Sequence, residues 1–261
     1  MRLSIIIPVL NSHEALRRQL LHLQTVGLPD ECELILVDDG CAPPIQNTST
    51  MPVRIMRTCD YRDWTWALAR NRGARFAKGE YLLMYDLDHI ASRPLIDFVM
   101  ESDCPRIQFN RELAALDENG ALIQDREVLE SEWGLLPEVP IRVEHHRNSF
   151  AMRRDLFWEL GGYVEDRVNR PYPQGEDNLF WQKWLAYQEK NGIEPPESTP
   201  PLYAFPVGRW CGDVDHNPFG LFHKLSRKTH RNYWWNRQKD GSLAEKTLYY
   251  YPYHHPERSK T

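Results

Sequence analysis

Residues 69–89 read ARNRGARFAKGEYLLMYDLDH, and this stretch decides the fold. Its first half has the apolar spacing of an amphipathic helix, which ends before Gly79. A short apolar strand follows at residues 81–85 and delivers Asp86 and Asp88. Because alternate residues of an extended chain point the same way, both carboxylates can share one face at the strand's end. Two carboxylates there suit a hard divalent cation, and such a cation suits a diphosphate.

Buried strands and helices alternate through the N-terminal part of the chain. Apolar runs predict strands, and helical spacing predicts helices, at residues 3–9 (strand), 12–26 (helix), 34–37 (strand), 53–56 (strand) and 64–77 (helix). This alternation predicts an α/β fold with a mostly parallel sheet and right-handed crossovers. Ligands of such sheets bind beyond the carboxyl ends of the strands. The polar residues expected at those ends are Asn11, Asp38, Asp39, Asp86 and Asp88.

The pattern changes after residue 100. Two strands, at 106–109 and 122–123, are expected to be joined by the polar turn at 117–120. Further expected elements are a strand at 148–152 and helices at 153–160, 176–188 and 221–235. The helix at 176–188 is expected to bury four side chains, Leu179, Phe180, Trp184 and Tyr187.

Composition excludes several classes of protein. With 261 residues and a net charge of −5, the chain shows no broad attraction to nucleic acid or to an anionic membrane. It has no apolar run of membrane-spanning length and no secretory leader, so we expect no transmembrane segment. Its five cysteines are scattered and form no CxxC pair, which favours reduced thiols and a cytoplasmic location.

Six motifs occur along the chain in this order: IIIPVLN, LILVDDG, ALARNRGA, GEYLLMYDLDH, FWELGGY and GEDNLFW. Over roughly residues 1–190 this series resembles the family 2 glycosyltransferases and related GT-A enzymes. The resemblance implies a GT-A, Rossmann-like sheet with an antiparallel acceptor-side extension and a helical or loop C-terminal segment. Residues 1–100 would form the nucleotide-sugar-binding half, 101–205 the acceptor-side and catalytic half, and 206–261 a C-terminal extension.

The resemblance also implies donor-site residues. Asp38 or Asp39 would accept a hydrogen bond from the N–H of a uracil-type base, and Asp86 would contact the ribose or sugar. The remaining contacts to the base, ribose and nucleotide would come from Pro8, Leu10, Asn11, Arg70 and Asn71. The sequence departs from the family pattern where Leu10 replaces an aromatic residue and where Cys41 follows the DDG turn.

The metal is expected at Asp88. A second DxD, at residues 213–215, follows a loop rather than a buried strand and is therefore the weaker candidate. In such enzymes a downstream histidine often completes the site, which leaves His216 and His223 open, with Lys224 nearby favouring His223. Imidazole and carboxylate together suit Mn²⁺, with Mg²⁺ as the alternative. The pair His145-His146 is expected nearer the acceptor.

Glu176 and Asp177 are expected at a helix N-terminus, where free N–H groups and the helix dipole stabilise carboxylates. The resemblance makes Asp177 the general base of an inverting enzyme and Glu176 an acceptor or sugar contact. An acceptor hydroxyl is a poor nucleophile until a positioned base removes its proton.

The expected activity is metal-dependent, inverting transfer of a hexose from a UDP-sugar to an acceptor hydroxyl on a glycan, a lipid-linked sugar or a modified nucleic acid. Basic and aromatic residues between Lys224 and Lys239 leave open a viral-type enzyme that glycosylates hydroxymethylated DNA bases. A nucleotidyltransferase would need a glycine-rich loop after the first strand, which PVLNSHEAL lacks. A non-catalytic nucleotide-sugar-binding module is the other alternative.

Overall fold

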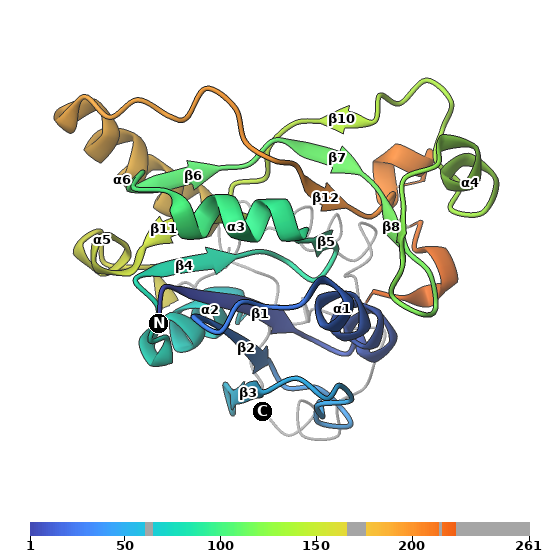
Figure 1. Cartoon of the computed structure of the whole chain (residues 1–261), viewed down its shortest axis with the longest axis horizontal. Helices are drawn as coiled ribbons and strands as arrows, with labels where there is room; N and C mark the ends of the chain where they lie inside the picture. The colour runs from blue at the N-terminus through green and yellow to red at the C-terminus, as the bar shows by residue number, and fades with distance from the viewer. Residues whose placement is uncertain (61–64, 166–175, 214–215, 223–261) are drawn as a thin grey trace, which may run out of the picture.

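A computed structural model describes residues 1–60, 65–165, 176–213 and 216–222, and a sheet of six strands lies at its centre (Figure 1). The strand order is β3-β2-β1-β4-β11-β6. The strands are β1 (Leu3–Val9), β2 (Cys32–Asp38), β3 (Val53–Arg57), β4 (Tyr81–Met84), β6 (Arg106–Gln108) and β11 (Phe150–Arg153). Strands β1 to β4 are mutually parallel, and β11 runs antiparallel to both of its neighbours. The predicted α/β class with a mostly parallel sheet is confirmed.

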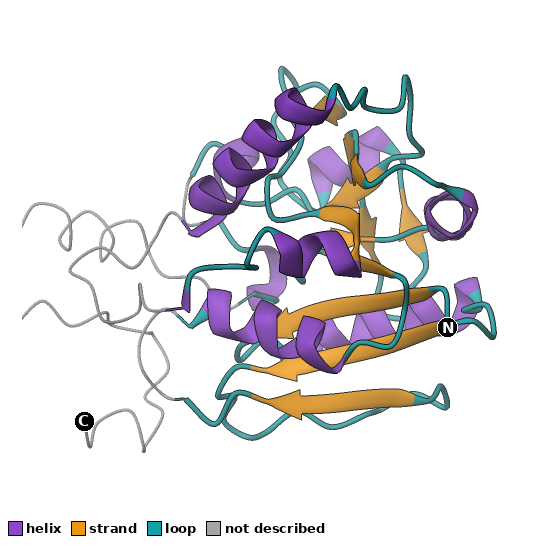
Figure 2. Cartoon of the chain, turned by 90° about the vertical axis from the view of Figure 1, so that its left-hand side faces the viewer, coloured by secondary structure: helices purple, strands orange, loops and turns teal. Residues whose placement is uncertain are grey.

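Helices cover both faces of this sheet, as Figure 2 shows from the side. They are α1 (His13–Val26), α2 (Trp66–Phe76), α3 (Arg93–Glu101), α5 (Arg154–Glu159) and α6 (Glu176–Asn191). Side chains alternate along β1, so that Ile5 and Ile7 pack in one cluster with α1 and α3. Ile6 packs in the other cluster, with α2, α5 and α6. Burial on both faces explains the uninterrupted apolar run of β1.

A smaller sheet, of order β10-β7-β12-β5, extends the fold beside the central one. Its strands are β5 (His89–Ile90), β7 (Arg111–Leu113), β10 (Arg142–Val143) and β12 (Leu202–Ala204). The remaining elements are the hairpin of β8 (Ala115–Leu116) and β9 (Leu122–Ile123), α4 (Arg126–Ser131) and the 3₁₀ turns Gly208–Cys211 and Pro218–Gly220. Within the described ranges, no helix has the length and apolarity that crossing a bilayer requires.

Two sequence expectations are wrong. The strand at 106–109 does not pair with 122–123: β6 pairs with β11, and β9 pairs with β8, which immediately precedes the polar turn. The polar turn lies at the expected residues, but it joins β9 to the extended residues just before it rather than to the strand at 106–109. Leu179 is 38% exposed rather than buried, because α6 buries a narrow stripe through Phe180 and Trp184. The helix expected at 221–235 lies almost wholly outside the described residues.

Candidate functional site

Sheet topology gathers the candidate residues at one edge. Strand β4 ends at Met84, and Asp86 and Asp88 follow it directly. Because β11 is antiparallel and its first residue pairs with Met84, the segment before β11 arrives at the same edge. This segment contains His146, whose Nδ1 lies 3.5 Å from Oδ2 of Asp86. A histidine expected near the acceptor therefore lies against the first acid of the DxD motif.

Arg70 connects the DxD motif to the N-terminus of α6. Its side chain is 2% exposed, and its guanidinium pairs with Asp86 while Nη1 lies 3.7 Å from Oε1 of Glu176. The rings of Trp66 and Tyr163 lie 5.9 and 5.5 Å from the guanidinium carbon. Burial alone would lower the pKa of Arg70, but Asp86, Tyr163 and Glu176 together raise it. A permanent cation thus joins α2, the end of β4 and α6.

The two acids at the start of α6 differ in environment. Glu176 is buried against Arg70, whereas the half-buried Asp177 has no hydrogen-bond or ion-pair partner among the residues that the structure describes. Both lie in the first turn, where free backbone N–H groups favour negative charge. A carboxylate that no cation holds can accept a proton from a bound hydroxyl.

One group of side chains near the DxD motif could hold a metal ion. The ligand atoms of Asp86, His89 and His146 lie within 4.8 Å of one another. Burial lowers the pKa of His146 to about 4, with His89 and Arg111 acting in the same sense and Asp86 opposing. His146 is therefore neutral at physiological pH, which is the form that binds metals. One carboxylate and two imidazoles suit a divalent transition metal.

The metal ligands expected from the sequence lie in different places. Asp88 is next to this group, with its Oδ1 2.9 Å from Nδ1 of His89, but it is not a member of it. His216 is not a member either, and its Nε2 lies 3.0 Å from the carbonyl oxygen of Trp133. His223 falls outside the described residues.

Asp38 and Asp39, at the end of β2, have separate roles in their loop. The two carboxylate oxygens of Asp38 accept hydrogen bonds from the backbone N–H groups of Gly40, Cys41 and Ile45, at 2.7 to 3.1 Å. Asp39 instead accepts from the hydroxyl of Thr65, at 2.8 Å, just before α2. Asp38 therefore shapes the loop, and Asp39 links it to α2.

The end of β1 is built into the same loop. Pro8 and Leu10 are buried, and Asn11 adopts a left-handed backbone with φ of 47°. The amide oxygen of Asn11 accepts from the N–H of Ala42 at 2.8 Å, and its own N–H donates to Sγ of Cys41 at 3.3 Å. Burial raises the pKa of the Cys41 thiol, with Asp38 adding to the effect. Cys41 thus acts as a neutral spacer between the two strand ends.

Asn71 is used inside the protein. Its amide group donates to the carbonyl oxygen of Tyr163 and to Glu165, both at 2.8 Å, and its oxygen accepts from the N–H of Tyr163 at 3.0 Å. These bonds fasten α2 to the turn after α5. They engage the side chain that the family resemblance assigns to the nucleotide.

Arg111 and Gln108 also contact the candidate site, and no sequence pattern indicates them. Arg111 lies 3.1 Å from Nε2 of His89, and Gln108 donates to the carbonyl oxygens of His146 and Ser149 at 2.8 and 2.9 Å. The histidine was visible in DLDH, but its partner comes from a strand two places away in the smaller sheet. No local pattern could have indicated that register.

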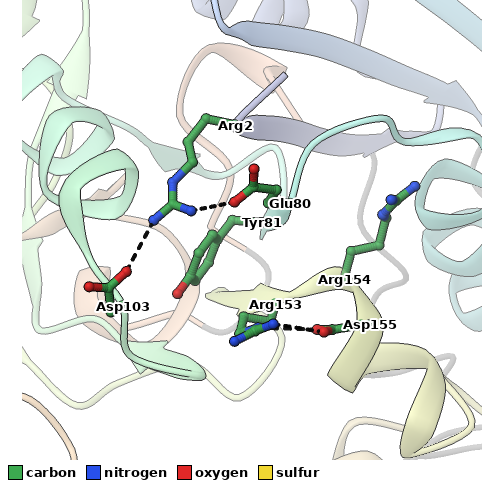
Figure 3. A pocket seen from close by; sticks show the side chains of 7 residues that line it. All are labelled: Arg2, Glu80, Tyr81, Asp103, Arg153, Arg154 and Asp155. Atoms are coloured by element: carbon green, nitrogen blue, oxygen red, sulfur yellow. Dashed lines mark hydrogen bonds and ion pairs between the residues drawn. The ribbon is translucent and has the colours of Figure 1, made fainter.

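A polar cavity of about 400 Å³ lies at the opposite end of the central sheet (Figure 3). It is lined by Arg2, Glu80, Tyr81, Asp103, Arg153, Arg154 and Asp155. Tyr81 begins β4, so this cavity is at the amino ends of the parallel strands. It contains none of the site residues expected from the sequence.

Comparison with known proteins identifies part of the chain. Residues 4–101 match the family described as Glycosyl transferase family 2, so the resemblance seen in the motifs is confirmed over that range. No curated protein matches the sequence.

Two solved structures illustrate the structural similarity. The structure of S. aureus TarS 1–349 is similar with a TM-score of 0.49 and 20% identity, over 78% of this chain and 60% of that one. The mannosyltransferase PcManGT from Pyrobaculum calidifontis, in complex with GDP-Man and Mn²⁺, is similar with a TM-score of 0.45 and 18% identity, over 78% of this chain and 56% of that one. The chain therefore spans three-fifths of these proteins or less.

Proposed function

We propose that this chain, which carries a family 2 glycosyltransferase domain, is a metal-dependent inverting glycosyltransferase. It moves one sugar from a nucleoside-diphosphate-sugar, with UDP as the expected nucleotide, to an acceptor hydroxyl. One observation carries the proposal: Arg70 joins Asp86 of the DxD motif to Glu176 beside Asp177. The donor-side and acceptor-side acids therefore meet at the carboxyl ends of the parallel strands.

The donor nucleotide would bind where the loops after β1 and β2 meet. We assign the base contact to Asp38 or Asp39, the two acids where β2 ends and its loop begins. Pro8, Leu10 and Asn11 form the adjoining wall in this assignment. Asp86, held by Arg70, would face the ribose or the sugar.

Asp88 and His146 would hold the divalent cation, with Asp86 beside them. The fit rests on the ligand types and their neighbourhood: His146 belongs to the same group as Asp86, Asp88 contacts His89 of that group, and Mn²⁺ accepts carboxylate oxygen and neutral imidazole as ligands. When bound, the cation would offset the charge of the departing nucleoside diphosphate. This assignment places His146 in the role that the sequence left open between His216 and His223.

Asp177 would remove the proton from the acceptor hydroxyl as the new glycosidic bond forms. It lies in the first turn of α6. Glu176, held by Arg70, would fix the angle at which α6 presents Asp177 to the acceptor. Attack from the face opposite the leaving diphosphate inverts the anomeric centre.

The test is thermal unfolding of the full chain with UDP, GDP and their sugar conjugates, each with Mn²⁺ or with EDTA. Ligands that bind the native state raise the melting temperature by mass action. We expect a rise with UDP and Mn²⁺ that EDTA removes and that Asp88→Asn reduces. No rise with any nucleoside diphosphate would contradict the proposal, and a rise without any turnover would favour a non-catalytic binding module.

A further inference from the structure

Both ring nitrogens of His89 have defined partners. Its Nδ1 lies 2.9 Å from Oδ1 of Asp88, and its Nε2 lies 3.1 Å from Nη1 of Arg111. A guanidinium can only donate hydrogen bonds, so Nε2 must be the accepting nitrogen. A neutral imidazole carries one N–H, and here that N–H must be at Nδ1 and must donate to Asp88. The two contacts together specify a single tautomer.

The smaller sheet explains how these groups come together. In β12, Ala204 is the register partner of His89 in β5, and Leu202 is the partner of Arg111 in β7. Arg111 therefore reaches His89 across β12. Its Nε also donates to the carbonyl oxygen of Glu144, at 2.5 Å. Both His89 and Arg111 are buried, at 2% and 5% exposure, so neither side chain has room to turn freely.

These contacts compete with a role for His89 as a metal ligand. His89 has a ligand atom near those of Asp86 and His146, but Arg111 already occupies the lone pair of Nε2, and Nδ1 carries the hydrogen. Metal binding through His89 would break one of the two contacts and leave a buried polar group unpaired, which is unfavourable. His146 differs, since its Nε2 has no hydrogen-bond partner among the described residues.

We propose that Arg111 and His89 are positioning residues, which hold the Asp88 carboxylate in the orientation that binds the cation, and that His89 is not itself a ligand. The inference rests on the proposed function in one respect only, namely that Asp88 binds the metal. Residues that hydrogen-bond a metal ligand without touching the metal commonly change metal affinity by about 10- to 100-fold when they are lost.

The first experiment measures the tautomer directly and needs neither metal nor substrate. Nitrogen NMR of the ¹⁵N-labelled full chain distinguishes protonated from unprotonated ring nitrogens, and His89→Asn identifies the His89 signals among those of the ten histidines. We expect hydrogen at Nδ1 and none at Nε2. Hydrogen at Nε2 would overturn the proposal, whatever the protein proves to catalyse.

The second experiment separates positioning from ligation through a matched pair of variants. The amide nitrogen of Asn reaches about where Nδ1 lies in histidine, and that of Gln about where Nε2 lies. His89→Asn can therefore still donate to Asp88, whereas His89→Gln cannot. Mn²⁺ is titrated into each variant, alone and with UDP, and free Mn²⁺ is measured by electron paramagnetic resonance.

We expect His89→Asn to bind Mn²⁺ within about threefold of the unmodified protein, and His89→Gln and Arg111→Met to bind about tenfold more weakly. Arg142→Met is the matched control, because Arg142 is on neighbouring β10 with its side chain 77% exposed, and its affinity should not change. Equal losses in both His89 variants would overturn the proposal and make His89 a ligand. An unchanged affinity in a folded Arg111→Met protein would also overturn it.

Failure of the proposed function has a different signature. If no nucleoside diphosphate raises the melting temperature, the transferase proposal fails while the tautomer result stands. If Arg111→Met does not fold, the NMR measurement and the two His89 variants still decide the matter.

Discussion

Both ends of the central sheet have arginine–carboxylate ion pairs, but the pairs differ in their exposure to solvent. At the amino ends, Arg153 pairs with Asp155, and the side chains are 53% and 67% exposed. At the carboxyl ends, Arg70 pairs with Asp86 and Glu176, with exposures of 2%, 20% and 6%. Figure 3 shows the pair of Arg2 with Glu80 and the pair of Arg153 with Asp155 that line the cavity at the amino ends.

The difference in exposure favours the carboxyl ends of the strands as the place of the proposed site. An exposed ion pair contributes between zero and about 1 kcal/mol, because water already solvates both partners. A buried pair must offset a large loss of hydration, so it persists where its geometry is tightly supported. Arg70 has that support from α2, the end of β4 and α6, whereas we expect exchange of the charges around the amino-end cavity to have little effect on stability. The comparison therefore predicts unequal effects of matched substitutions at the two ends.

The largest effect should come from Asp177→Asn. Loss of the general base should reduce the rate of sugar transfer by about 10²- to 10⁴-fold, while the thermal shift with UDP and Mn²⁺ is retained. The measurement is the initial rate of UDP release in the presence of acceptor. Asp155→Asn, at the amino end, is the control and should leave the rate unchanged. A fully active Asp177→Asn protein would remove the base assignment.

Arg70→Met should have the next largest effect, this time on stability. It leaves the buried Glu176 and the partly buried Asp86 without their cation, and breaking a buried pair lowers the free energy of unfolding by about 3–5 kcal/mol. Glu80→Gln removes a partner of Arg2 whose side chain is 66% exposed, and it should cost less than about 1 kcal/mol. Urea unfolding of both variants measures the difference. Similar losses in the two proteins would mean that the two ends do not differ as described.

Gly79→Ala tests packing at the amino ends. We expect the protein to tolerate changes of charge there, but not an added side-chain atom in a closely packed position. A Cβ at Gly79 would lie 2.5 Å from the backbone nitrogen of Ser4 and 2.6 Å from the carbonyl carbon of Leu3. Backbone cannot move aside easily, so we expect a loss of about 1–3 kcal/mol in urea unfolding. A loss no larger than that of Glu80→Gln would show that the strand ends can separate there.

Sequence reasoning reached the parts of the site that depend on one strand or helix. Asp86 could be assigned to a strand end and Asp177 to a helix N-terminus, because apolar runs and capping patterns are local. The contact between His146 and Asp86 could not be predicted, since it depends on β11 running antiparallel beside β4. The contact between Arg111 and His89 could not be predicted either, because β12, which lies between their strands, is about ninety residues further along the chain.

The same limit applies to the fold. The central sheet follows from long, doubly buried strands whose apolar runs are unmistakable. The smaller sheet is built from strands of two or three residues, which are too short to show a period. Its register comes from packing between distant segments, and this is also where the metal-side contacts of Arg111 and His89 arise.

The smallest effect should come from a pair of intermediate exposure. Glu14 on α1 bonds Arg17 and Arg18, and the hydrogen bond from Arg17 is the main reason that its pKa is lowered to about 2. Since the folded pKa is below the unfolded value, the unfolded chain binds more protons between the two. The stabilisation is therefore complete above about pH 4.5 and is lost as the pH falls toward 2.

Glu14→Gln should flatten this part of the stability profile, as measured by urea unfolding at pH 6 and at about pH 3. With a side chain 43% exposed, the change should be smaller than that for Arg70→Met, and an unaltered pH slope would show that water screens the pair completely.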